Sequence, residues 1–127
     1  MSISFNPEER LVLTTGNLWG PNGLSVIRLV VDTGATYTVI SREAAETVGY
    51  DLTEHGETLT IATGSRLEIL PVFRIDRLVA LDRELRNMDV LCHTVPGGLD
   101  VDGLLGLDFF RGRRLTIDFR EGSISLD

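Results

Sequence analysis

The sequence predicts a mostly β fold with one or two short helices. Short apolar runs, many of which alternate with polar residues, are separated by turn-forming residues, and this pattern is typical of strands. One segment, Ser41 to Val48, carries helix signals at both of its ends. The 127 residues contain no internal repeat, low-complexity tract or linker, so we expect residues 1–127 to form a single domain.

The first predicted strands lie on either side of a long loop. Leu11 to Thr14 is the first candidate, and the turn-forming residues after it end in Gly20 to Gly23. Val26 to Val31 is nearly continuous in β-branched and aliphatic residues, as a strand buried on both faces would be. This strand runs directly into Asp32-Thr33-Gly34, and an apolar strand resumes from Tyr37 to Ile40.

The predicted helix has a local signal at each end. The Ser41 side chain can cap the first turn, and Glu43 lies near the positive end of the helix dipole, where an acidic side chain is stabilising. Gly49 can end the helix, because glycine readily adopts the left-handed conformation that follows many helices. The segment from Ser41 to Val48 is therefore the best helix candidate in the chain.

The second half of the chain predicts further strands. Thr58 to Leu70 has apolar residues on both sides of a short turn-like stretch and predicts a hairpin, with its turn at Ala62, Thr63, Gly64 and Ser65. Val72 to Leu81 and Leu85 to Cys92 are the next expected strands. Leu104 to Phe110 is apolar but interrupted by a glycine and an aspartate, and the alternation from Leu115 to Leu126 predicts a closing hairpin.

Composition and charge exclude several classes of function. The net charge of −7 argues against a nucleic acid or an anionic membrane as a partner. The single Cys92 forms no internal disulfide, and His55 and His93 lack the spacing of metal ligands, so no metal or cofactor is expected. Asp100 to Gly103 hints at a calcium loop, but the later acidic ligands are missing. No run approaches the roughly 18 apolar residues that span a bilayer, so we expect a cytoplasmic protein.

Asp32 needs an explanation, because it follows a strongly hydrophobic strand. Burying a lone carboxylate costs free energy unless hydrogen bonds or a bound proton compensate. Gly34 allows a tight turn whose backbone N–H groups point at the carboxylate, and Thr33 supplies a nearby hydroxyl. The alternative is a surface turn in which Asp32 only hydrogen-bonds its own backbone. The tripeptide alone does not decide between these two interpretations.

The segment around Asp32 is similar to a known family. Val30 to Thr36, followed by Val39-Ile40-Ser41, resembles the active-site segment of retropepsin-like aspartic proteases. The resemblance implies a closed acid-protease barrel with one or two short helices and one lobe per chain. It also implies that Asp32 is catalytic, and that Thr33, Gly34 and Ala35 support the active-site loop.

Later segments resemble further elements of the same family, in the same order. Gly103 to Phe110 is similar to its hydrophobic-hydrophobic-Gly element and the short helix that follows, and the three residues of that element are Leu104, Leu105 and Gly106. Thr58 to Leu70 falls where the family has its flap, so the flap candidates are Ala62, Thr63, Gly64 and Ser65. Leu115 to Leu126 resembles the terminal hairpin of cellular and bacterial members. The resemblance covers roughly residues 10–126.

The chain departs from the retroviral members at two positions. Those proteins have an aspartate two positions after the motif glycine, where this chain has Thr36, and an arginine after the second glycine, where this chain has Leu107. In the family these two charges pair near the dimer interface. Because both charges are missing here, no charge is left alone, and we expect a dimer contact that differs from the viral one.

The chemistry that the resemblance implies is peptide-bond hydrolysis by a water held between two carboxylates. Two carboxylates about 3 Å apart cannot both ionise easily, so they share one proton; the ionised member acts as general base and the protonated member polarises the scissile carbonyl. The sequence holds only one Asp-Thr/Ser-Gly tripeptide. A symmetric homodimer, in which Asp32 and its copy meet on the axis, is therefore expected, with a peptide or protein as substrate.

Other interpretations stay open at the level of sequence. The chain can be a catalytically silent retropepsin-like module that binds peptides or mediates dimerisation, or a small β-barrel in which Asp32 is only a turn residue. The flap candidate can be an ordinary surface hairpin. Asp102 is a weaker candidate for an in-chain partner of Asp32, and Asp108 is expected to cap the short helix or tie it to the region of Thr38.

Overall fold

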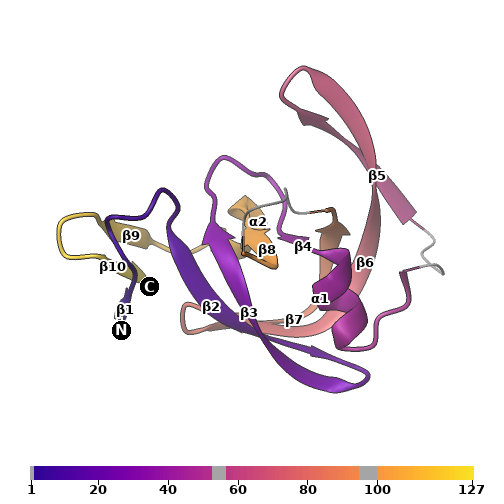
Figure 1. The fold of residues 1–127 in the computed structure, drawn as a ribbon, viewed down its shortest axis with the longest axis horizontal. Coiled ribbons are helices and arrows are strands. Elements are labelled where there is room, and N and C mark those ends of the chain that lie inside the picture. Colours follow the sequence, from indigo (N-terminus) through magenta and orange to yellow (C-terminus); the bar gives the residue numbers. More distant parts are fainter. Residues whose placement is uncertain (1, 53–56, 95–99) are drawn as a thin grey trace.

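The barrel of this protein is closed by strands from nearly the whole length of the chain (Figure 1). The structure, a computed structural model, describes residues 2–52, 57–94 and 100–127. Each barrel strand is hydrogen-bonded to the next, and β2 pairs with both β3 and β6, which closes the ring. In spatial order these strands are β2 (Leu13–Gly20), β3 (Gly23–Val31), β8 (Gly103–Leu105), β4 (Val39–Ile40), β7 (Arg83–Cys92) and β6 (Arg66–Ala80). The prediction of a mostly β closed barrel is confirmed.

The first barrel hairpin differs from the sequence prediction in two ways. A long loop after Thr14 was predicted, whereas β2 continues to Gly20, because its second half pairs with β3 on one side and β6 on the other. Burial on both faces was predicted for the next strand, whereas Ile27 is 2% exposed and Val26 is 67% exposed. Both corrections come from tertiary pairing: a strand in the wall of a barrel has one face in the core and one in water.

A small second sheet lies beside the barrel. Its strand order is β1 (Ser2–Ser4), β10 (Ser123–Leu126) and β9 (Leu115–Asp118), all antiparallel. The predicted closing hairpin is confirmed by β9 and β10, whereas β1 was not predicted, because its short polar sequence has little strand signal of its own. Ile124 is buried in the core and Ile3 packs against it, so this sheet is attached to the barrel through its apolar face.

Two short helices complete the described elements, as predicted. α1 (Arg42–Thr47) begins after Ser41, whose hydroxyl accepts a hydrogen bond from the Ala44 N–H at 3.1 Å, and it ends before Gly49, which has a φ of +98°. α2 (Leu107–Phe110) buries two phenylalanines in the core. Among the described residues, no helix is long and apolar enough to cross a membrane.

The predicted hairpin is present, and it projects from the barrel (Figure 1). It consists of β5 (Glu57–Thr63) and the first half of β6, a 15-residue strand whose second half belongs to the barrel wall. Gly64 and Ser65 form its turn, and Gly64 has a φ of +61°, which favours glycine. The hairpin and the barrel wall therefore share one continuous strand.

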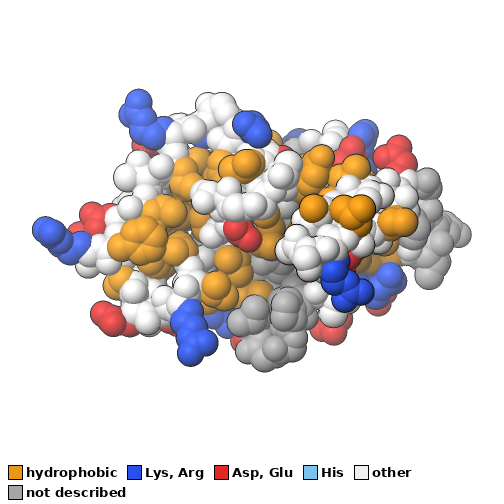
Figure 2. Space-filling view, turned by 90° about the horizontal axis from the view of Figure 1, so that it is seen from above, with side chains coloured by type: hydrophobic (Ala, Val, Ile, Leu, Met, Phe, Trp, Pro, Cys, Tyr) orange, Lys and Arg blue, Asp and Glu red, His pale blue; other side chains and the backbone are white. Residues whose placement is uncertain are grey.

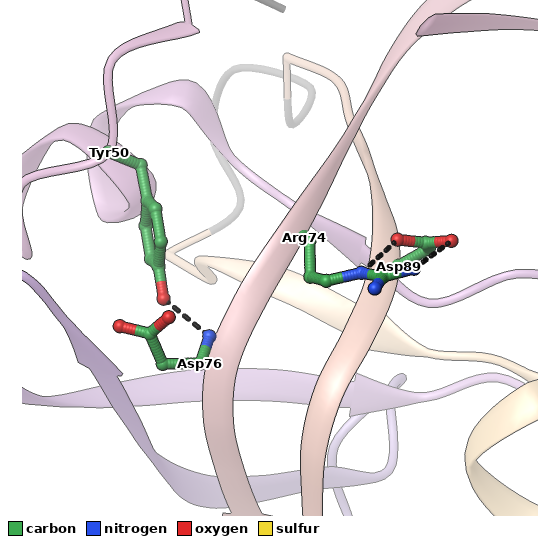
Figure 3. A network of polar contacts seen from close by, with 4 residues as sticks. All are labelled: Tyr50, Arg74, Asp76 and Asp89. Atoms are coloured by element: carbon green, nitrogen blue, oxygen red, sulfur yellow. Dashed lines mark hydrogen bonds and ion pairs between the residues drawn. The ribbon is translucent and has the colours of Figure 1, made fainter.

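Polar contacts hold the part of β6 where the hairpin leaves the barrel (Figure 3). The Tyr50 hydroxyl donates to the Trp19 carbonyl at 2.6 Å and accepts from the Asp76 N–H at 2.7 Å, which ties β2 to β6. Burial raises the pKa of Tyr50. On the neighbouring strand Asp89 pairs with Arg74, with 3.1 Å between Oδ1 and Nε, and this hydrogen bond raises the pKa of Arg74.

Candidate active site

Asp32 lies where β3 ends, at the mouth of the barrel. Its N–H donates to the Leu105 carbonyl at 3.0 Å, and the Gly34 N–H donates to its Oδ1 at 3.0 Å. The Ala35 N–H donates to the Asp32 carbonyl at 3.2 Å, which closes the turn. Asp32 is half-buried, whereas Thr33 and Gly34 are exposed. The backbone of Asp32 is therefore fixed on both sides, and its carboxylate accepts from the Gly34 N–H while it remains partly exposed.

The hydrophobic-hydrophobic-Gly element lies directly beside this turn. In the register of β8, Leu105 is opposite Val31 of β3 and Leu104 is opposite Val39 of β4. A side chain at Gly106 would place its Cβ 2.5 Å from the Tyr37 carbonyl carbon, which no real contact allows. The Asp32 segment and the hydrophobic-hydrophobic-Gly element are thus in contact, and glycine is required for their close approach.

Thr38 and Asp108 fasten the two segments to each other. Thr38 is fully buried, and its hydroxyl donates to Asp108 Oδ1 at 2.6 Å and accepts from the Gly106 N–H at 3.2 Å. The Thr38 N–H also donates to both carboxylate oxygens, at 2.9 and 3.0 Å. Asp108 therefore ties α2 to the Thr38 region, which was one of the two predicted roles; the cap position of α2 is instead Gly106.

A cleft of about 580 Å³ opens beside Asp32 and extends beneath the hairpin. Most of its wall is apolar, as in many peptide and ligand sites. The described residues that line it are Asp32, Gly34, Ala35, Thr36, Tyr37, Val39, Thr60, Ile61, Ala62, Leu70, Leu91, His93 and Leu104. Figure 2 shows the face seen from above, where orange apolar side chains lie on both sides of a central acidic group.

Some of the predicted site residues line the cleft, and others lie beside it. Gly34, Ala35 and Leu104 line it together with Asp32, and Ala62 lines it from the hairpin. The other flap candidates lie at the tip: Thr63 ends β5, and Gly64 and Ser65 form the turn.

Sequence reasoning missed Tyr37 and His93 as cleft residues. Tyr37 was assigned only to a strand, and its side chain is 40% exposed within the cleft wall. His93 directly follows β7, and only the position of that strand beneath the hairpin brings it to the site. The other histidine, His55, lies outside the described residues.

Asp102 does not join Asp32. Its carboxylate accepts from the Arg28 N–H at 2.9 Å, and in the paired strands this position lies several residues from the end of β3 where Asp32 stands. Cys92 is buried, and burial raises the pKa of its thiol, as expected for a core residue rather than a nucleophile. Among the described residues, no group of histidine, cysteine, aspartate and glutamate side chains is arranged to hold a metal ion.

Comparison with known proteins decides the family. A family model described as aspartyl protease matches residues 17–109, which include Asp32, the hairpin and the Thr38–Asp108 contact. This chain belongs to the aspartyl protease family. Its fold is similar to that in the crystal structure of a retropepsin-like aspartic protease from Rickettsia conorii, with a TM-score of 0.70 and 24% identity over 99% of this chain and 88% of that one. No curated protein matches the chain in sequence.

Membership of the aspartyl protease family indicates which chemistry the carboxylate beside the cleft is suited to. Hydrolysis of this type needs one carboxylate that accepts a proton from water and one that holds a proton. The aspartyl protease chain described here has one motif carboxylate, presented at the surface beside an apolar cleft. Chemistry of this type needs a second carboxylate that faces the first.

Proposed function

We propose that the chain is an aspartic endopeptidase whose active form is a symmetric homodimer, with Asp32 of each copy forming the catalytic pair. The observation that carries the proposal is the position of Asp32: its carboxylate is held by the Gly34 N–H, yet Thr33 and Gly34 beside it are exposed at the mouth of an apolar cleft. The alternative, in which Asp32 is only a surface turn residue, does not account for the apolar cleft beside it. Two-fold symmetry supplies the second carboxylate without a second motif.

In this proposal the residues around Asp32 have separate roles. Asp32 is the general base in one copy and the protonated partner in the other, and the roles exchange between copies. Gly34 holds the carboxylate, Thr33 contacts the second copy, and Ala35 lines the substrate cleft. Leu104, Leu105 and Gly106 support the loop from below, through the Leu105 carbonyl and the close approach to Tyr37.

The proposed reaction is the hydrolysis of a peptide bond without a covalent intermediate. Water between the carboxylates loses a proton to the ionised Asp32 as its oxygen attacks the scissile carbonyl, whose oxygen takes the proton of the other Asp32. When this tetrahedral intermediate collapses, the C–N bond breaks, the amine leaves with the proton that the first Asp32 took from water, and a hydroxyl of the intermediate returns a proton to the second Asp32. An extended peptide is the proposed substrate, because the apolar cleft runs under a hairpin whose strand edge can hydrogen-bond a main chain. The tip residues Ala62, Thr63, Gly64 and Ser65 are the proposed flap, which closes over the peptide.

Asp32→Asn tests the assignment, because it removes the base and keeps the shape of the side chain. We expect peptide cleavage to fall to background while circular dichroism and the dimer mass in sedimentation stay unchanged. Asp102→Asn is the matched control, since it removes the same charge from a carboxylate that accepts from the Arg28 N–H and lies outside the lining of the cleft. Loss of cleavage in Asp102→Asn, with activity kept in Asp32→Asn, would overturn the assignment.

Sedimentation and pH dependence test the dimer and the shared proton. We expect a dimer at micromolar concentrations, or one that forms when a peptide-like inhibitor is added; a mass that stays monomeric under both conditions argues against catalysis. A rate that needs one carboxylate ionised and one protonated follows a bell-shaped dependence on pH. We expect useful activity at mildly acidic pH that falls toward neutrality, and no effect of a chelator. A rate that rises continuously into alkaline pH contradicts the proposed chemistry.

A further inference from the structure

His93 lines the cleft and contacts Glu68 of the hairpin. His93 follows β7, and its Nε2 lies 3.4 Å from Oε2 of Glu68. Glu68 belongs to the hairpin half of β6, where it stands opposite Ile61, a residue of the cleft wall. Its neighbours Leu67 and Ile69 are 76% and 69% exposed and point to the opposite face of the strand, so Glu68 points toward the body of the protein.

Through His93, this contact borders a cleft whose wall is mostly apolar. Asp32 and His93 are the acidic and basic side chains among the described residues that line the cleft, and the apolar ones are Ala35, Val39, Ile61, Ala62, Leu70, Leu91 and Leu104. A charged substrate side chain loses hydration when it enters such a space, and this costs free energy unless an opposite charge or a hydrogen bond replaces the water. His93 and Glu68 could each provide one, but they are engaged with each other.

We propose that the His93–Glu68 pair sets the charge preference of the substrate cleft. While the pair is intact, a charged substrate side chain that reaches it must displace one member from the other, so uncharged side chains are favoured there. This inference rests on the proposed peptidase function and adds to it the class of side chain that the cleft accepts.

Replacing His93 and replacing Glu68 are expected to shift the charge preference of the cleft in opposite directions. His93→Gln removes one of the partners of the Glu68 carboxylate, whose negative charge is then less balanced and favours a lysine or arginine of the substrate. Glu68→Gln takes the carboxylate away from His93, whose ring N–H then donates to a glutamate or aspartate of the substrate. The two side chains are 40% and 34% exposed, so solvent screens the effect, and we expect changes of roughly two- to fivefold.

Symmetry sharpens the inference. In a homodimer the pair occurs twice, once on each side of the catalytic axis, and an extended peptide passes both copies. The altered preference is therefore expected at two substrate positions, one on each side of the scissile bond. A cleft built by a single chain would change the preference on one side only.

The test uses the full chain and peptides that carry Lys, Glu or Gln at one position at a time. We expect His93→Gln to raise kcat/KM for Lys over Gln, and Glu68→Gln to raise it for Glu over Gln, each roughly two- to fivefold and at positions on both sides of the bond. Arg74→Gln is the control: it removes a cross-strand pair from the same strand outside the lining of the cleft, and the ratios are expected to stay as in the unchanged chain.

The possible failures are distinct. If the unchanged chain cuts peptides and the ratios stay constant in both variants, the inference is wrong and the proposed function stands. If it cuts no peptide, the same ratios are measured as peptide affinities in the Asp32→Asn background, where opposite shifts support the charge preference without catalysis. Absence of both cleavage and binding overturns both proposals.

Discussion

The segment from Asp32 to Thr38 is fastened along its length to β8 and α2, whereas the β5–β6 hairpin beyond the barrel is paired mainly with itself. In the first region Asp32, Ala35 and Thr38 each exchange a hydrogen bond with residues 105–108, and Thr38 is fully buried. In the second, Leu67 and Ile69 are 76% and 69% exposed. The proposed catalytic group thus lies on the rigid side of the cleft, and the side that must admit a substrate is the weakly attached one.

The largest expected difference between the two regions is in the free energy of unfolding when one glycine of each region is replaced by alanine. Gly106→Ala forces a Cβ onto the Tyr37 backbone, so we expect it to destabilise the fold by at least about 3 kcal/mol or to prevent folding. Gly64→Ala meets open space at the hairpin tip and is strained only by its φ of +61°, so a loss of about 1 kcal/mol is expected. Urea unfolding of both variants measures the difference. Equal losses would refute the distinction between the two regions.

Removing the Asp108 carboxylate tests how the rigid side is held. In Asp108→Ala the Thr38 N–H and hydroxyl lose the acceptor that they share, and a buried donor left without a partner costs about 1–3 kcal/mol. Because the loop that bears Asp32 is anchored there, we also expect kcat to fall more than KM changes. Asp108→Asn keeps one acceptor oxygen and should recover most of the loss. A variant that lowers stability but leaves kcat unchanged would show that the anchor does not position Asp32.

The smallest effect is expected at the foot of the hairpin. Tyr50→Phe removes the hydroxyl that joins Trp19 and Asp76, and we expect a loss of about 1 kcal/mol. Since burial raises the pKa of Tyr50, the folded chain keeps the phenolic proton to higher pH than the unfolded chain does. The stability from this proton is fully present below the unfolded value of about 10 and is lost as pH rises through the folded pKa. Urea midpoints measured across this alkaline range should therefore fall less steeply for Tyr50→Phe; an unchanged slope would contradict the assignment.

Elements with local signals were predictable, and elements that depend on distant partners were not. The cap at Ser41, Gly49 after α1 and the turn at Gly64 each reflect the preferences of a few neighbouring residues, and all three lie where the sequence indicated. The length of β2 depends on its pairing with β6. In this pairing Gly16 lies opposite Ala80, which is more than 50 residues later in the sequence. The strand β1 depends likewise on its pairing with β10, so its own short polar sequence did not predict a strand.

The same distinction applies to the candidate site. Asp32 and the Leu104-Leu105-Gly106 element have distinctive sequences, so both were identified from the family resemblance, whereas of the contacts between their segments only a tie of Asp108 to the Thr38 region was considered. His93 was not, because nothing in the residues around it specifies that the end of β7 lies beneath a hairpin. Exposure along a strand was equally hard to predict, since Val26 and Ile27 have nearly the same chemistry and face opposite sides of the barrel wall.

The small sheet brings the two ends of the chain together. Ser2 pairs with Ser125, and Figure 1 shows the N and C labels side by side. The backbone therefore follows a nearly closed ring, and a few linking residues between the ends would complete it. A circularly permuted version, in which these ends are joined and the chain is opened at an exposed turn, would therefore keep every strand next to its present neighbours.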